Sequence, residues 1–239
     1  MASTWEKTKE FYNWVLESGD PRTDSWFLVH SPLPVTFLFA SYLFVVALGP
    51  FYMCHRKPLK LRGLLITYNL AMMALSSYMF YEQMARVCWW FFFSKVIELL
   101  DTVFFILRKK QEQVTFLHVY HHGTMLFNWW SGVKYVPGGQ AFFIGMLNSF
   151  VHIFMYGYYA LASLGPQMHH YLWWKRYLTI MQLCQFVAIA VHSSYNLFAE
   201  CPFPDGFNIA VFLYILSLIA LFLHFYYWTY TRGKKEKLT

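Results

Sequence analysis

Seven long apolar segments alternate with short polar connections along most of the chain. They cover residues at roughly 33–54, 62–81, 86–107, 113–132, 139–164, 172–198 and 207–230. Each is long enough, or nearly so, to cross the hydrocarbon core of a bilayer, which takes about 20 helical residues. The pattern predicts an all-α integral membrane protein with seven transmembrane helices. Because the connections are short, we expect residues 1–239 to form a single domain.

The first thirty residues differ from the rest, because they mix charged and aromatic side chains and contain no apolar run. We expect a short amphipathic helix from Trp5 to Leu16, followed by a turn at Asp20-Pro21. Without a stretch of small and apolar residues, this segment does not resemble a cleavable signal peptide. It is expected to lie on the luminal side, with residues 231–239 forming a cytosolic tail.

Composition and charge agree with this picture and add an orientation. Only 13% of residues are charged and 58% are hydrophobic, whereas soluble domains average about 25% charged. The formal charge of +7 comes mainly from alternate connections, as the positive-inside rule predicts. It therefore needs no nucleic-acid partner. The basic residues on the predicted cytosolic side are Arg56, Lys57, Lys60, Arg62, Arg108, Lys109, Lys110, Lys175, Arg176, Arg232, Lys234, Lys235 and Lys237.

The third span contains three charged residues that are costly inside a membrane: Lys95, Glu98 and Asp101. Each charge near the centre of a span costs at least about 2.5 kcal/mol on insertion scales. Lys95 and Glu98 are three residues apart and can form an ion pair on one helix face. This pair is either a helix-packing device or part of the wall of a polar cavity.

Histidines and amides follow in the next three spans. His118, His121 and His122 have the i, i+3, i+4 spacing that places all three on one face of a helix. In the fifth span, Asn148 and His152 are one turn apart, and Tyr156 lies one turn further on. The sixth span contains Gln182 and Gln185, which serve either as interhelical glue or as part of a site.

Four consecutive spans thus present polar groups on helices that are otherwise apolar. This arrangement predicts an enclosed polar site that opens into an apolar cavity suited to an acyl chain. A cytosolic rim of basic residues would bind a phosphate-bearing headgroup. The rim consists of Arg108, Lys109, Lys110, Lys175 and Arg176.

The histidines admit two kinds of chemistry, metal ligation or nucleophilic and acid–base catalysis. Membrane desaturases and hydroxylases also carry an HxxHH box, but their di-iron sites draw histidines from several boxes. This chain has one box, and the cysteines show no CxxC spacing. We therefore predict no metal and keep a histidine-box di-iron desaturase or hydroxylase as the alternative. A seven-helix receptor or transporter would leave the order of the motifs unexplained.

Four motifs in order resemble the fatty acid elongase family. They are Lys95-x-x-Glu98-x-x-Asp101-Thr102, His118-x-x-His121-His122, His152-x-x-Met155-Tyr156-x-Tyr158-Tyr159 and Thr179-x-x-Gln182-x-x-Gln185. The resemblance runs from about Trp26 to the C-terminus. The stretch from Gln113 to Leu117 is similar to the branch that acts on polyunsaturated and very long chains.

The resemblance implies a 3-ketoacyl-CoA synthase, which condenses long-chain acyl-CoA with malonyl-CoA and needs no cofactor. It also implies six helices in an inverted barrel around an acyl tunnel, with the first span outside. Within this chemistry we expect His121 to take the acyl group and His152 to assist malonyl decarboxylation or stabilise the enolate. His118 and His122 would orient groups or relay protons, with Glu98 and Asp101 fixing their tautomers. Asn148 and Gln182 are expected oxyanion donors.

The resemblance also sets expectations for location and partners, and it reveals one departure. The tail Lys235-Glu236-Lys237-Leu238-Thr239 resembles a dilysine retrieval signal of the endoplasmic reticulum. Expected partners are membrane lipid, other enzymes of the elongation cycle and a second copy of the chain. The connection between the second and third spans is shorter than usual in the family. Cys201 resembles a cysteine whose partner would lie in that connection.

Overall fold

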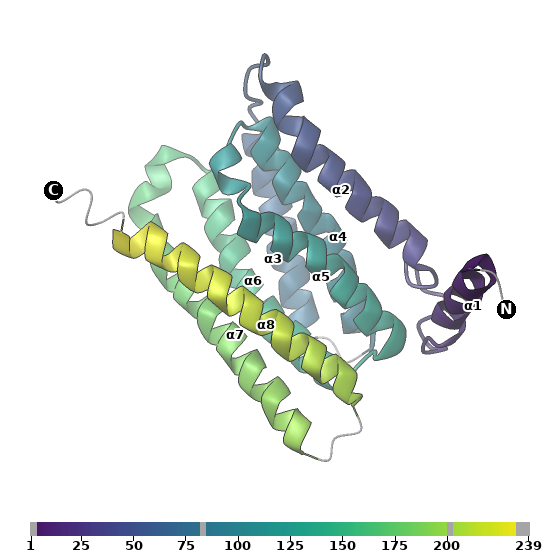
Figure 1. The fold of residues 1–239 in the computed structure, drawn as a ribbon. Coiled ribbons are helices and arrows are strands. Elements are labelled where there is room, and N and C mark those ends of the chain that lie inside the picture. The colour runs from purple at the N-terminus through teal and green to yellow at the C-terminus, as the bar shows by residue number, and fades with distance from the viewer. Residues whose placement is uncertain (1–3, 82–84, 200–202, 233–239) are drawn as a thin grey trace. The chain divides into compact units, whose positions relative to one another are not determined.

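A computed structural model describes residues 4–81, 85–199 and 203–232, and the regular structure in these ranges is helical throughout (Figure 1). A short helix precedes seven long ones, and short 3₁₀ turns lie in two of the connections. The α helices are α1 (Thr4–Glu17), α2 (Pro32–Met53), α3 (Arg62–Tyr81), α4 (Ala85–Leu107), α5 (Phe116–Tyr135), α6 (Gln140–Ser163), α7 (Lys175–Phe198) and α8 (Asp205–Tyr226). The 3₁₀ turns are η1 (Gln111–Gln113) and η2 (Pro166–Leu172), and a π-helical turn, η3 (Tyr227–Arg232), continues α8.

The positions of these helices confirm the all-α membrane fold class. Five helical segments are long and apolar enough to cross a bilayer: Pro32–Met53, Arg62–Phe80, Gln140–Ser163, His170–Phe198 and Asp205–Arg232. The helices α4 and α5 have similar lengths but fall outside this set. The first contains Arg86, Lys95, Glu98 and Asp101, and the second carries the three histidines. The count of seven spans and the barrel around a tunnel therefore stay predictions.

The chain divides into two units, which are described one at a time. The first comprises residues 1–58, 83–114 and 122–142, and the second comprises 59–82, 115–121 and 143–239. The second unit thus takes the first turns of α5, and the first unit takes the remainder of that helix. The prediction of a single domain over 1–239 concerns both units together and stays a prediction.

In the first unit, α2 packs closely against α4. A Cβ on Gly49 would lie 2.9 Å from the side chain of Ile106, so glycine permits the close approach. The hydroxyl of Thr102 donates a hydrogen bond to that of Tyr42 at 3.3 Å. Where α2 ends, the ammonium of Lys109 donates to the carbonyl of Cys54 at 3.0 Å. A cation thus satisfies one of the carbonyls that the end of α2 leaves without a partner in the helix.

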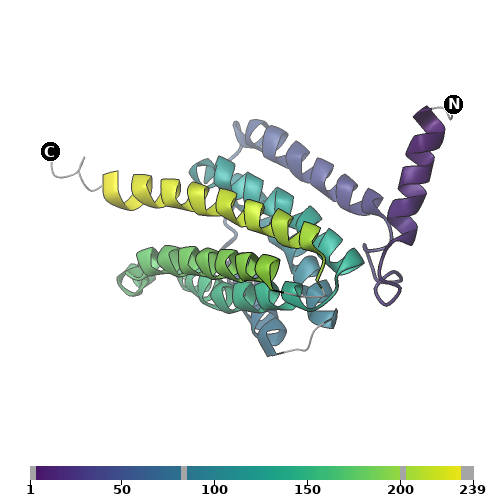
Figure 2. The same ribbon diagram turned by 60° about the horizontal axis from the view of Figure 1, so that its bottom comes forward.

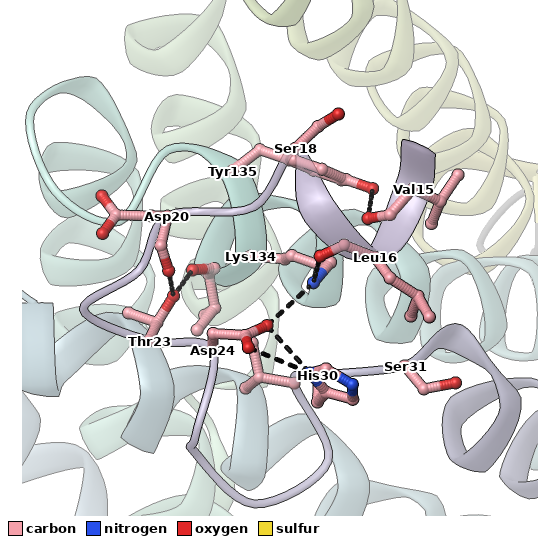
Figure 3. Close-up of polar contacts among 12 residues, drawn as sticks. Val15, Leu16, Ser18, Asp20, Thr23, Asp24, His30, Ser31, Lys134 and Tyr135 are labelled. Atoms are coloured by element: carbon pink, nitrogen blue, oxygen red, sulfur yellow. Dashed lines mark hydrogen bonds and ion pairs between the residues drawn. The ribbon is translucent and has the colours of Figure 1, made fainter. Parts of the chain in front are cut away.

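The N-terminal segment of this unit is fastened to the last turn of α5 by a network that we call the N-terminal clamp (Figure 3). The ammonium of Lys134, only 1% exposed, lies 3.2 Å from both the carbonyl oxygen of Leu16 and a carboxylate oxygen of Asp24. The hydroxyl of Tyr135 donates to the carbonyl of Val15 at 3.1 Å. Two side chains of α5 therefore bind carbonyls at the C-terminal end of α1.

Bonds in the opposite direction complete the clamp. The hydroxyl of Thr23 donates to the carbonyl of Val133 at 2.8 Å, and the amide of Asp20 donates to that of Lys134 at 2.6 Å. The carboxylate of Asp24 also lies 3.0 Å from Nδ1 of His30. Side chains of α5 thus bind carbonyls of α1, and the loop that follows α1 binds carbonyls of α5 (Figure 3).

In the second unit, α7 and α8 lie side by side along most of their lengths (Figures 1 and 2). Their interface has an apolar core, and its most buried members are Phe186, Ile189, Ala190, Ile215 and Leu218. The guanidinium of Arg62, at the start of α3, donates to the carbonyl of Leu164 beyond the end of α6. Another cation therefore binds a carbonyl that has no partner in its own helix.

The clamp predicts an acid-sensitive attachment of α1. Burial alone would raise the pKa of Asp24, but the hydrogen bonds and charges of His30 and Lys134 bring it below its ordinary value of 3.8. A lowered carboxyl pKa stabilises the folded form above the ordinary pKa, and this contribution is lost as the pH falls through the lowered value. We expect hydrogen-exchange protection of the α1 amides to fall several-fold as the pH drops below about 4.

The variant Asp24→Asn should lower that protection at neutral pH and remove most of its acid dependence. A matched control is Asp20→Asn, because the hydrogen bond from Arg22, the largest effect on Asp20, also lowers the pKa of that carboxyl. Its side chain bonds within the loop and does not reach α5. Equal effects of the two variants would contradict a role specific to Asp24.

Candidate active site

A buried ion pair lies in the middle of α4. The ammonium of Lys95 is 2.7 Å from Oε1 of Glu98, and both side chains are 1% exposed. The same ammonium lies 4.4 Å from the centre of the Phe91 ring, which adds a cation–π contact. The pairing follows from the i, i+3 spacing and confirms that part of the prediction.

The second carboxylate oxygen of Glu98 faces the histidine box. Oε2 lies 4.0 Å from Nδ1 of His122, on α5 of the same unit. At this separation the two groups interact electrostatically without a hydrogen bond. One carboxylate therefore has a lysine on one oxygen and an imidazole near the other, in surroundings that exclude most water. This geometry can orient the ring of His122 and can respond to a proton on it.

The box lies in the first two turns of α5, nearer the helix start than the predicted span of 113–132 implied. The side chain of Thr115 accepts a hydrogen bond from the amide of His118 at 3.2 Å. This is the N-cap geometry, in which a side chain accepts from the third helical amide. Because Thr115 ends the preceding connection and η1 occupies 111–113, the helix begins at Phe116. His118, His121 and His122 thus follow the cap closely on one continuous helix.

In the second unit, α6 carries Asn148, His152 and Tyr156 at successive turns, and all three are buried. The rings of His152 and Tyr156 have centroids 5.6 Å apart, and Tyr68 of α3 approaches Tyr156 edge-on at 6.3 Å. The shared face predicted from the i, i+4 spacing is therefore turned into the interior of this unit.

The glutamines of α7 lie beside this group. The amide of Gln182 contacts Sδ of Met155 at 3.8 Å, and Gln185 is buried. Met155 belongs to the motif that begins at His152, so two of the four sequence motifs meet between α6 and α7. In this contact the side-chain amide of Gln182 donates to sulfur, which is a weak acceptor.

Several members of the predicted basic rim bind the protein itself. Lys109 donates to the carbonyl of Cys54, and Lys110 lies 3.7 Å from the carboxylate of Glu112. Arg176 donates to the hydroxyl of Tyr226 at 2.6 Å and lies over its ring at 5.3 Å from the centroid. Arg108 belongs to the first unit with the two lysines, whereas Lys175 belongs to the second with Arg176.

The structure thus brings the predicted residues together in two groups, one in each unit. The first contains Lys95, Glu98 and His122, and the second contains Asn148, His152, Tyr156 and Gln182. Within the described residues, no cluster of three or more histidine, cysteine, aspartate or glutamate side chains has the arrangement of a metal site. Cys201, the lysines of the tail and most of the short connection after Tyr81 lie outside the described residues.

Two structural roles were not predicted from the sequence: the cap at the start of α5 and the buried lysine of the N-terminal clamp. Thr115, the cap that fixes where the box begins, has the threonine-before-helix signal, but the apolar run that starts at Val114 obscured it. Lys134 is not among the basic residues of the predicted cytosolic side, and no buried role was predicted for it. Its place at the end of an apolar, tryptophan-rich helix was the available signal that it needs buried partners.

Comparisons with known proteins assign the chain to a family. The ELO (GNS1/SUR4) family matches residues 27–87 and 80–238. The chain is 45% identical to very long chain fatty acid elongase 4 of Homo sapiens, over 99% of this chain and 84% of that protein. It is 43% identical to elongase 7 of Rattus norvegicus, over 96% and 92% of the two chains, and 44% identical to elongase 2 of Mus musculus, over 91% and 83%.

The comparisons also support the departure between the second and third spans. The alignment with the human protein has 263 positions, more than the 239 residues of this chain, so that relative has residues without a counterpart here. The two family matches meet and overlap at residues 80–87, where α3 gives way to α4. A split at this point is what a missing segment produces. The resemblance drawn from the four motifs is confirmed, and the chain belongs to the ELO (GNS1/SUR4) family.

Proposed function

We propose that this membrane protein is a very-long-chain 3-oxoacyl-CoA synthase, the condensing enzyme of fatty acid elongation. It joins a long-chain acyl-CoA to malonyl-CoA and releases 3-oxoacyl-CoA, carbon dioxide and CoA. The support is family membership along nearly the whole chain, with relatives named very long chain fatty acid elongases. The observation that carries the proposal is the buried Lys95–Glu98 pair, in which the second carboxylate oxygen of Glu98 lies 4.0 Å from Nδ1 of His122.

The first half-reaction is acyl transfer to the protein. A ring nitrogen of His121 attacks the thioester carbonyl, the carbon–sulfur bond breaks, and the CoA sulfur leaves with the proton that the imidazole loses. The product is an acyl-imidazole, which is reactive enough to acylate carbon. No cysteine is needed, and of the three described cysteines Cys88 is buried while Cys54 and Cys184 are exposed.

The second half-reaction forms the new carbon–carbon bond. Malonyl-CoA loses carbon dioxide, and the electrons of the broken bond become the enolate of acetyl-CoA. The enolate carbon attacks the acyl-imidazole, the carbon–nitrogen bond breaks, and the His121 ring that leaves takes up one proton from water. His152 would assist the decarboxylation or stabilise the enolate, with Asn148 as an oxyanion donor. Gln182 could serve in the same way only after its amide turns away from Met155.

The remaining residues of the box would position the reactive ones. His118 and His122 would hold tautomers or relay protons, with Glu98 and Asp101 behind them. A buried carboxylate that is held by Lys95 keeps a fixed position, so it can fix the ring of His122 as well. Such preorganisation lowers the cost of reaching the transition state.

Substrate binding follows from the same arrangement. An apolar cavity among the spans would hold the acyl chain, and the basic rim would hold the phosphates of CoA. Arg108 and Lys175 would bind phosphate at the rim, and Tyr156 would line the cavity. Lys109, Lys110 and Arg176 would exchange their protein contacts for phosphate. Gln185 would line the cavity. The proposed partners are other enzymes of the elongation cycle and a second copy of the chain.

The nucleophile can be tested with purified protein, labelled malonyl-CoA and a panel of acyl-CoAs. We expect malonyl-dependent products longer by two carbons, and a loss of at least about 100-fold in rate for His121→Ala. The matched control is His170→Ala in η2, an exposed histidine outside the motifs. Incubation with acyl-CoA alone should raise the intact mass by one acyl group in the wild type and not in His121→Ala. Condensation by His121→Ala would overturn the nucleophile, whereas no product from the wild type would overturn the function.

The ion pair can be tested by comparing single and double variants. Lys95→Met leaves the Glu98 carboxylate buried without its partner, which costs about 3–5 kcal/mol of unfolding free energy. The double variant Lys95→Met with Glu98→Leu removes both charges and should regain most of the stability. If Glu98 orients His122, the double variant stays slow in kcat although it is stable. Recovery of both stability and kcat would show that the pair serves helix packing alone.

The protein is proposed to reside in the membrane of the endoplasmic reticulum with its C-terminus in the cytosol. The support is the basic residues on alternate connections and the dilysine-like tail. In intact microsomes, protease should remove an epitope at the C-terminus and leave one at the N-terminus until detergent is added. Cleavage of the N-terminal epitope in intact microsomes would place the N-terminus in the cytosol and contradict the proposed orientation. If both epitopes were cleaved, the number of spans would be even.

A further inference from the structure

The helix α1 presents three distinct faces. Glu6, Glu10, Asn13 and Glu17 follow the i, i+4, i+7, i+11 spacing and form one polar stripe. Tyr12, Val15 and Leu16 form a second face, which is partly buried against the rest of the first unit. The clamp described above binds this second face. The third face is therefore the one whose role the clamp leaves unexplained.

That third face carries Phe11 and Trp14, with Lys7 one turn before Phe11. Their rings stack with centroids 5.9 Å apart, and the residues are 64% and 61% exposed. A single exposed apolar residue needs no explanation, but two large aromatic rings that pack on one another form a contiguous apolar surface. Phenylalanine and tryptophan on a helix with a separate polar stripe are the side chains of helices that lie in a membrane interface.

A contact of α1 lies at one end of a candidate membrane span. The hydroxyl of Tyr12 lies 3.0 Å from that of Ser31, which is the N-cap of α2. Because α2 is a candidate span, its N-cap lies near one surface of the bilayer. Leu33 and Phe37 in the first turns of α2 are exposed, as lipid-facing residues are. Figure 2 shows that α1 turns away from the direction of α2 instead of extending it.

From these observations we propose that α1 is an interfacial helix that binds the lipid surface at this end of α2. Phe11 and Trp14 enter the boundary between headgroups and acyl chains, and the glutamate stripe stays in water. The helix contains Lys7 and Lys9 against three glutamates, so attraction to anionic lipid cannot be the source of binding. The partner is therefore a zwitterionic bilayer surface, held by aromatic side chains.

The proposal can be tested by spin labelling of the full chain in phosphatidylcholine nanodiscs. After the four native cysteines are replaced by serine, single cysteines at positions 11 and 13 carry a nitroxide. Both positions are exposed, but they lie on different faces of α1. We expect the label at 11 to be accessible to oxygen and protected from a water-soluble nickel chelate, and the label at 13 to show the reverse. A label at position 14 should behave as the label at 11 does, with position 13 again as the control.

The outcomes separate lipid from other occupants of this face. Equal nickel accessibility at 11, 13 and 14 would overturn the proposal. Dipolar broadening between labels at 11 in nanodiscs that hold two copies would assign the face to a second chain and would also overturn it. Protection at 11 that appears only with added phosphatidylserine would contradict the aromatic mode. Protection that is unchanged by phosphatidylserine supports it.

Discussion

Backbone carbonyls at the ends of membrane helices need a donor, and much of this structure is arranged to supply one. A helix leaves its last carbonyls without partners, and a bilayer offers little water to replace them. Lys109 donates a hydrogen bond to a carbonyl at the end of α2, and Arg62 donates to the carbonyl beyond α6. Lys134 and Tyr135 donate to carbonyls at the end of α1. In each case the donor comes from a helix or connection distant in sequence, so the same bonds that satisfy the backbone also fix which elements are neighbours.

The buried ion pair of α4 also consists of polar groups that need a partner away from water, but here both groups are charged. Replacing such a pair by well-packed apolar residues is often neutral or stabilising. Stability alone therefore does not explain why charged residues occupy positions 95 and 98. The position of the second carboxylate oxygen, 4.0 Å from Nδ1 of His122, offers a better one. A charged group that cannot move is an effective orienting partner for an imidazole, and burial strengthens its field.

Much of the helical arrangement could be predicted because its signals are local. Apolar runs of about 20 residues mark the long helices within a few positions, and the i, i+3 spacing was enough to pair Lys95 with Glu98. The start of α5 was placed three residues early because the apolar run begins before Thr115, the residue that caps the helix. The last span was predicted to 230 as one helix, whereas α8 ends at Tyr226 and changes to a π-helical turn. Hydropathy does not distinguish these two kinds of helix.

Contacts between distant residues could not be predicted in the same way. Asp24 and Lys134 are 110 positions apart, and no periodic pattern connects them. The same holds for Gln182 and Met155, which meet only once α6 and α7 are packed. The resemblance to the elongases supplied the identity of the motif residues and so carried the prediction further than composition could. It did not supply the partner of each motif, because that depends on which helix faces which.

The cap at Thr115 has an electrostatic consequence for the box. The first amides of a helix point away from it unpaired and give that end about half a positive charge. His118, His121 and His122 lie within two turns of this end of α5, so the local potential favours negative charge beside them. A thioester oxygen gains such charge when its carbonyl is attacked, and so does an enolate oxygen after decarboxylation. The position of one threonine thus determines where along α5 developing anions are most stable.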